Sequence, residues 1–118
     1  MKYSYSVEAL QLKYSKHFTF VLSKEFETIT RFLNSDIGEE YGASIYLKEI
    51  KSVQSGEIEE KTISGNSTII RIKSDFTIVT DMFFEQKSVS IETTELILLI
   101  EAFIKEKKKF YDTLGCEK

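Results

Sequence analysis

The segment from Glu57 to Glu92 limits the possible fold more than any other part of the chain. Within it, apolar and polar residues alternate over short runs, which is the pattern of strands that bury one face. Turn-forming residues separate the runs, most clearly Ser64-Gly65-Asn66-Ser67, where Gly and Asn tolerate a positive φ. The first run is rich in charge, which suits the edge of a sheet. We predict an antiparallel meander with strands at 57–63, 68–73, 76–84 and 88–92.

A long amphipathic helix is predicted after the meander. Thr93 is a candidate N-cap, and Glu95 suits the positive N-terminal end of the helix dipole. Lysines between 105 and 109 complement the negative C-terminal end in the same way. Apolar residues recur every three or four positions, as they do on the buried stripe of a helix. The stripe consists of Leu96, Leu99, Ile100, Phe103 and Phe110.

The first half of the chain predicts two more strands and two helical segments. Alternating residues place strands near 3–7 and 18–22. A helix follows, with Ser23 as its candidate N-cap and Gly38 as its candidate end in the left-handed conformation. Residues 44–53 fit a helix or a strand, and we favour the helix. The predicted fold class is therefore α+β, a mostly antiparallel β-sheet of four to six strands with two main helices packed on one face.

Length and composition predict a single domain spanning residues 1–118. The chain is 42% hydrophobic, which is enough for a core, and its formal charge of −3 argues against a general nucleic-acid binder. Its single cysteine, Cys116, excludes an internal disulfide and a zinc site built from cysteines. No secretory signal is visible, and the longest apolar run, Leu96 to Ile100, is too short to span a bilayer. We expect a cytoplasmic protein with no nucleic-acid and no membrane partner.

Residues suited to catalysis or metal binding are scarce. His17 is the only histidine, and we interpret it as an ordinary surface or interface residue rather than a catalytic base. The chain has no Gly-x-Ser-x-Gly elbow and no glycine-rich phosphate loop. The stretch Asp36-Ile-Gly-Glu-Glu-Tyr-Gly42 is rich in carboxylates, but it lacks the alternating acids of a calcium loop. We expect no enzyme activity, no metal and no cofactor.

Acidic residues gather in two parts of the chain. Residues 36–60 hold seven acids and two lysines, and residues 75–101 hold six acids and one lysine. The end of the last helix, 102–111, carries a net charge of +3 instead. If the two acidic groups share a face, that face suits a basic protein partner; a solvated rim with no partner is the alternative. The candidate partner contacts are Asp36, Glu39, Glu40, Tyr41, Glu57, Glu59, Glu60, Asp81 and Glu85.

Four stretches taken together resemble a known group of proteins. They are Ile29-Thr-Arg-Phe-Leu-Asn34, Glu39-Glu-Tyr-Gly42, Ser64-Gly-Asn-Ser-Thr68 and Ile91-Glu-Thr-Thr-Glu-Leu96. Their pattern resembles the small immunity proteins encoded beside bacterial polymorphic toxins, including those of contact-dependent growth inhibition. The resemblance implies a cytoplasmic, non-enzymatic antitoxin that binds the C-terminal domain of its cognate toxin, often a nuclease, and blocks it. An acidic face would then take the place of nucleic-acid phosphate.

A second hypothesis is a small-ligand-binding or regulatory α+β domain. Its pocket would lie between sheet and helix, behind Tyr3, Tyr5, Phe18 or Phe20. A deep cavity at that place would favour this hypothesis, whereas a filled core would argue against it. An enzyme that relies on carboxylates alone is the third and least favoured hypothesis.

Overall fold

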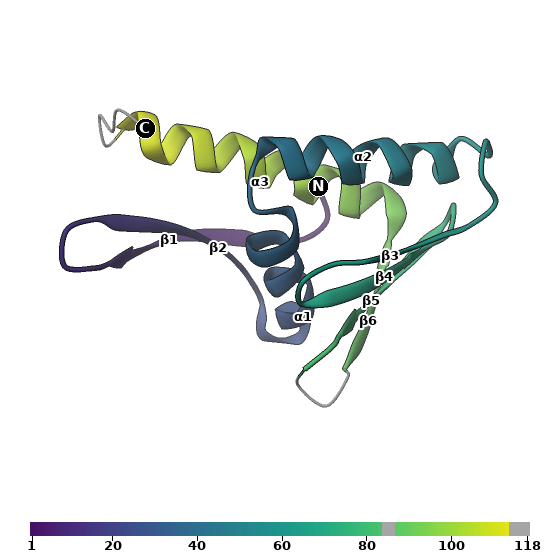
Figure 1. The fold of residues 1–118 in the computed structure, drawn as a ribbon, viewed down its shortest axis with the longest axis horizontal. Helices are drawn as coiled ribbons and strands as arrows, with labels where there is room; N and C mark the ends of the chain where they lie inside the picture. Colours follow the sequence, from purple (N-terminus) through teal and green to yellow (C-terminus); the bar gives the residue numbers. More distant parts are fainter. Residues whose placement is uncertain (84–86, 114–118) are drawn as a thin grey trace.

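The structure is a computed structural model that describes residues 1–83 and 87–113. Its elements are β1 (Tyr5–Gln11), β2 (Lys16–Leu22), η1 (Lys24–Phe26), α1 (Glu27–Arg31), η2 (Phe32–Ile37), α2 (Glu40–Gln54), β3 (Lys61–Ser64), β4 (Thr68–Ile72), β5 (Phe76–Asp81), β6 (Ser88–Glu92) and α3 (Thr93–Thr113). The described strands form two antiparallel sheets, and the two longest helices, α2 and α3, lie side by side (Figure 1). The predicted α+β class is confirmed.

The predicted four-stranded meander is also confirmed. Strands β3, β4, β5 and β6 pair in chain order, and each pairing is antiparallel. Alternate side chains point to one face of this sheet, where Ile70, Ile72, Val79 and Ile91 are at most 1% exposed. Helices α1 and α3 contact β5 and β6, and α2 contacts β3. The main core therefore lies between this sheet and the helices.

The first strand of the meander is shorter than predicted. β3 begins at Lys61 rather than at Glu57. The chain after α2 first folds back on the helix, and the N–H of Ile58 donates to the carbonyl of Ser52 at 3.1 Å. The charged residues 57–60 therefore lie in a loop and not in an edge strand.

The third strand of the meander is also shorter than predicted. β5 ends at Asp81, whose carboxylate accepts the N–H of Phe83 at 2.8 Å, a local bond of the kind that competes with a strand ladder. Phe84, the predicted last residue of the strand, lies outside the described residues, as do the first two residues of the turn predicted at 85–87.

The segment between β2 and α2 differs from the single helix predicted for it. It passes through the 3-10 turn η1, the short α-helix α1 and the π-helical turn η2. Ser23 occupies the predicted N-cap position, but its side chain makes no capping hydrogen bond; its carbonyl accepts the N–H of Phe26 at 2.9 Å. The predicted end is right: Gly38 closes the segment with a φ of 68°. The ammonium group of Lys107 donates to the carbonyl of Gly38, so α3 holds this end in place.

Helix α2 confirms the helix favoured for residues 44–53 and begins earlier, at Glu40. Glu39 is extended, with φ −153° and ψ 179°, so the chain makes a sharp corner between η2 and α2. Gly42 is required at this corner, because a Cβ atom there would lie 2.1 Å from the carbonyl oxygen of Ile37. The buried side of α2 carries Ala43, Tyr46, Ile50 and Val53.

Helix α3 is joined to the sheet by its first residue. Thr93 lies inside the helix rather than at the N-cap position predicted for it. Its hydroxyl donates to the carbonyl of Lys73 at 2.6 Å and lies 2.9 Å from the hydroxyl of Thr77. The apolar stripe predicted for this helix is confirmed, since Leu96, Leu99, Ile100 and Phe103 are at most 1% exposed.

Strands β1 and β2 form a separate hairpin whose base packs on α3. Tyr5 stacks on Phe20 with 4.4 Å between ring centroids, and Phe18 meets Phe103 edge-on at 5.5 Å. The side chain of Asn34 in η2 accepts the N–H of Phe20 at 3.0 Å and donates to its carbonyl at 2.8 Å. Because Asn34 occupies this edge of β2, the hairpin does not extend the four-stranded sheet.

The chain before β1 is attached to β6 by a carboxylate, which makes the attachment sensitive to acid. Glu92 accepts from the ammonium of Lys2 at 2.6 Å and from the hydroxyl of Tyr3 at 2.7 Å. These bonds, that of Lys2 first, lower the pKa of Glu92 from 4.5 to about 2. The stabilisation is therefore fully present above pH 4.5, where the unfolded-state carboxyl is also ionised, and it is lost as the pH falls towards 2.

We expect this acid sensitivity to disappear in the variant Glu92→Gln, which keeps the size of the side chain but not its charge. The free energy of unfolding of wild type minus that of the variant should be constant above about pH 5 and should shrink towards about pH 2. Urea denaturation of both proteins across this range measures it. A difference that does not change with pH would contradict the assignment.

Candidate functional site

The eight candidate partner contacts that the structure describes do not form one acidic face. Six of them are exposed: Glu39, Glu40 and Tyr41 lie at the start of α2, and Glu57, Glu59 and Glu60 lie in the loop that follows this helix. A helix of 15 residues is about 22 Å long, so α2 separates the two groups by most of its length. The chain therefore presents two acidic patches, one at each end of α2.

Asp36 is engaged within the chain. Its carboxylate accepts the N–H of Ser67 at 2.8 Å and the N–H of Thr68 at 2.9 Å, and it also accepts the hydroxyl of Thr68. The turn between β3 and β4 approaches so closely that a Cβ atom on Gly65 would lie 2.6 Å from the carboxyl carbon of Asp36. Asp36 thus holds the turn against η2, and its expected role as a partner contact does not fit this position. Burial and the nearby carboxylate of Asp36 raise the pKa of Tyr46, which lies beside the same turn.

Asp81 and Glu60 are not free surface carboxylates either. Asp81 is only 1% exposed, and it accepts from Nε of Arg31 at 2.7 Å, so it does not reach a partner. Glu60 accepts from Nε of Arg71 at 2.8 Å, and this bond holds the pKa of Glu60 below its usual value. Glu85 lies outside the described residues.

The start of α2 combines unpaired acids with exposed apolar side chains. Tyr41 is 72% exposed and Ile45 is 45% exposed, and residues four positions apart are neighbours on a helix surface. Glu39 and Glu40 are exposed beside them and make no ion pair with any described residue. We call these four residues the α2 surface. It offers an aromatic and an aliphatic side chain flanked by two carboxylates that form no ion pair within residues 1–83 and 87–113.

A shallow groove runs beside the α2 surface, where α2 meets α3. Its volume is about 280 Å³, and apolar side chains form its floor. Glu40 borders it on α2 and Glu101 borders it on α3, where Glu101 lies 3.6 Å from the ammonium of Lys51. The groove continues the α2 surface onto the neighbouring helix. Its lining residues are Glu40, Ala43, Ser44, Leu47, Glu101 and Ile104.

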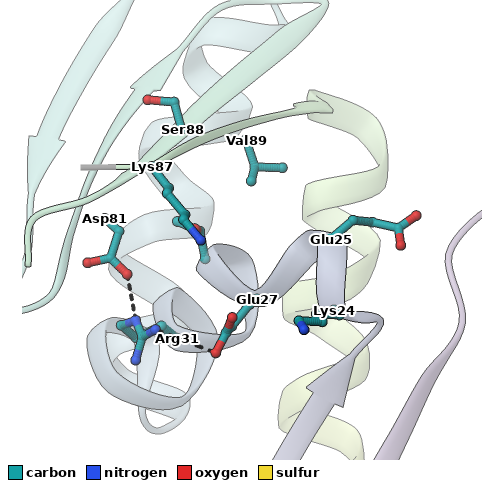
Figure 2. A pocket seen from close by; sticks show the side chains of 9 residues that line it. Lys24, Glu25, Glu27, Arg31, Asp81, Lys87, Ser88 and Val89 are labelled. Carbon is teal, nitrogen blue, oxygen red and sulfur yellow. Dashed lines mark hydrogen bonds and ion pairs between the residues drawn. The ribbon is translucent and has the colours of Figure 1, made fainter. Parts of the chain in front are cut away.

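A larger pocket, of about 640 Å³, lies between α1 and the neighbouring ends of β5 and β6 (Figure 2). Arg31 and Asp81 are joined at one side of it, and Glu27 lies 3.9 Å from the guanidinium of Arg31. Lys87 reaches towards α1 from the start of β6. Three cationic and three anionic side chains line the pocket, so its charge is balanced.

This pocket is not where the ligand-binding hypothesis placed it. The region behind Tyr3, Tyr5, Phe18 and Phe20 is filled, because these rings pack on one another, on Phe26 and on α3. No local sequence pattern predicts where this pocket lies. It depends on the approach of α1 to two strands about 50 residues away in the chain.

The described residues contain no evident catalytic or metal centre. Within residues 1–83 and 87–113, no three His, Cys, Asp or Glu side chains are grouped so that they could hold a metal ion. His17 is exposed on β2, where Nε2 lies 3.2 Å from the hydroxyl of Ser15 at the tip of the hairpin. No bond from a carboxylate orients this histidine among the described contacts, so the pair lacks the third member of a catalytic triad.

Comparison of the chain with protein-family models, with curated proteins and with solved structures finds no match. In the part of the chain that the structure describes, no helix is both long and apolar enough to cross a membrane.

Proposed function

We propose that this protein is an immunity protein that binds a cognate bacterial toxin domain, a nuclease, and blocks its active site. One observation carries the proposal: the α2 surface presents Tyr41 and Ile45 beside the unpaired carboxylates of Glu39 and Glu40. Aromatic residues supply much of the binding energy in protein interfaces, and complementary charge accelerates association. This combination suits a partner with an apolar spot inside a basic cleft.

The blockade would be steric and electrostatic. A nuclease cleft carries cationic side chains that bind phosphate, and two adjacent carboxylates at the start of a helix can occupy the same positions. Tyr41 and Ile45 would then exclude water from the centre of the contact. The resemblance to immunity proteins in several stretches of the sequence supports the same proposal.

Charge reversal on the α2 surface tests the proposal. In the double variant Glu39→Lys/Glu40→Lys, we expect the association rate with the toxin domain encoded by the neighbouring reading frame to fall by about 10-fold at low ionic strength. The salt dependence of that rate should also flatten, because the attraction between opposite charges is lost. Stopped-flow or surface plasmon resonance measurements at several salt concentrations give both quantities.

The other end of α2 provides a matched control. The double variant Glu57→Lys/Glu59→Lys makes the same change in net charge at two exposed positions in the loop after the helix. It should affect the association rate much less. Equal effects of the two double variants would show that only the net charge of the protein matters, and unchanged kinetics in the first would refute the role of the α2 surface.

The pocket beside α1 supports a second candidate function, the binding of a small molecule of mixed charge. Its volume of about 640 Å³ lies within the usual range for small-ligand sites, and Asp81 fixes Arg31 at its wall. Titration of the protein with amino acids and nucleotides, followed by the amide NMR signals of Ser88 and Val89, tests this function. Saturable shifts would favour it, whereas an unresponsive pocket in a protein that neutralises the toxin would exclude it.

A further inference from the structure

The outer edge of β1 has backbone groups without partners among the described residues. Because Phe20 uses its N–H and its carbonyl to bond Asn34, both groups point away from β1. Val7 is the cross-strand partner of Phe20, so Val7 belongs to a non-hydrogen-bonded pair and its own N–H and carbonyl point away from β2. Ala9 is two residues further along and points in the same direction. The edge therefore presents a row of open donors and acceptors.

The two edges of this hairpin differ. The edge of β2 is closed by three side chains: Asn34 bonds Phe20, the hydroxyl of Thr30 accepts the N–H of Leu22, and the hydroxyl of Tyr111 accepts the N–H of Phe18. The edge of β1 has no such cover in the described chain. Figure 1 shows the hairpin extending from the body of the molecule beneath the C-terminal part of α3.

Features that usually protect an edge strand are few on β1. The strand has seven residues, no proline and one charged residue, Glu8. Every residue from 6 to 11 is exposed. The outer strand of the larger sheet, β3, has only four residues and begins with Lys61, so that edge is both shorter and protected by charge.

A groove lies directly beside this open edge. Its volume is about 260 Å³, and Val7 on β1 and Phe110 on α3 supply its apolar surface. The remaining lining residues, Glu106, Lys109 and Thr113, follow the same side of α3. A strand added to β1 would direct alternate side chains towards this groove, because successive residues of a strand point to opposite faces. The edge would supply affinity through its backbone, and the groove would supply specificity.

Glu8 indicates which strand would fit. It lies on the face opposite Val7, makes no ion pair with any described residue, and has Thr19 as its cross-strand neighbour. Suppose that β1 of a second copy paired antiparallel with β1 over its whole length. Tyr5 of one copy would then lie opposite Gln11 of the other, and the two Glu8 residues would lie opposite each other. Like charges directly opposite each other destabilise a sheet, whereas a lysine or arginine at that place would stabilise it.

We propose that β1 accepts an extended strand of a partner protein as the third strand of the hairpin sheet. The added strand places an apolar side chain in the groove between Val7 and Phe110, and a lysine or arginine opposite Glu8. This surface is separate from the α2 surface: the hairpin packs on the side of α3 that carries Phe103, whereas α2 packs on the side that carries Glu101 and Ile104. The inference therefore does not depend on the proposed function.

Two measurements on the full chain test the proposal. Amide exchange by NMR in the free protein should be fast for Val7 and Ala9 and slow for Glu8 and Leu10, whose N–H groups bond to β2. The probe for binding is a phage-displayed library of random decapeptides, from which peptides that bind the wild-type protein are selected. Selected peptides should alternate apolar and polar residues and should carry a lysine or arginine at one fixed position. Their binding should slow the exchange of Val7 and Ala9.

Two variants then distinguish the edge from any other surface. Ala9→Pro removes an outward donor without removing a bond to β2, and it should weaken the selected peptides by at least about 10-fold. In Glu8→Lys, the peptides that bind best should carry an acidic residue at the fixed position instead of a basic one. Peptides selected on wild type should bind this variant about 5-fold more weakly. The far-ultraviolet circular dichroism of both variants should match that of wild type.

Three results would overturn the proposal. They are a library that yields no peptide, selected peptides that bind Ala9→Pro as tightly as wild type, and a wild-type dimer in sedimentation that becomes a monomer in Ala9→Pro. The last result would show that the occupant of the edge is a second copy. Because the peptide measurements involve no toxin, their failure leaves the test of the α2 surface unaffected.

Discussion

Replacing Gly42 by alanine is expected to destabilise the protein by about 3 kcal/mol, although alanine normally stabilises a helix by about 1 kcal/mol relative to glycine. The added Cβ atom would lie 2.1 Å from the carbonyl oxygen of Ile37 and 3.1 Å from its carbon. Both atoms belong to the backbone, so no side chain can move aside to make room. Either η2 or the first turn of α2 must shift. Urea denaturation of the purified variant, followed by circular dichroism, measures the loss.

Gly56 provides the control for this variant. It has a φ of 90°, but a Cβ atom there would meet no atom within 4 Å. Gly56→Ala therefore tests backbone strain without a clash, and we expect a smaller loss of about 1 kcal/mol. If Gly42→Ala were as stable as wild type, the corner between η2 and α2 would be able to relax. The close approach of Ile37 would then not explain the glycine.

The same corner shows what could be predicted from the sequence and what could not. The strands of the meander and the stripe of α3 follow from local periodicity, so alternation over a few residues was enough to predict them. The segment around Asp36 was predicted as a helix end that leads into an acidic surface. The helix end at Gly38 is confirmed, but Gly42 lies inside the next helix.

The roles of individual carboxylates depend on contacts between distant parts of the chain. Asp36 bonds to residues 31 and 32 positions away, and Asp81 bonds to a residue 50 positions away. No pattern within a window of the sequence contains such pairs. Counting acids along the chain therefore overestimated the acidic surface. The open edge of β1 could not be predicted for a similar reason. Alternation predicts a strand, but it does not predict which edge of the strand is left without a neighbour.

Removing the guanidinium of Arg31 is expected to cost about 3 to 5 kcal/mol, because it weakens the compensation of a buried charge. The side chain of Asp81 is 2% exposed, and Nε of Arg31 lies 2.7 Å from its Oδ2 atom. The variant Arg31→Met keeps much of the aliphatic length but cannot donate. The N–H of Phe83 still bonds Oδ1 of Asp81 in this variant. The free energy of unfolding in urea measures the effect.

Two comparisons separate burial from mere proximity. Arg71→Met removes a pair of nearly the same length, 2.8 Å between Arg71 Nε and Glu60 Oε2, but those side chains are 52% and 39% exposed. We expect it to cost less than about 1 kcal/mol, since water screens an exposed pair. The double variant Arg31→Met/Asp81→Leu should recover much of the stability that Arg31→Met loses, because no charge is left buried. If both arginine variants cost the same, the burial of Asp81 would not explain why Arg31 is needed for stability.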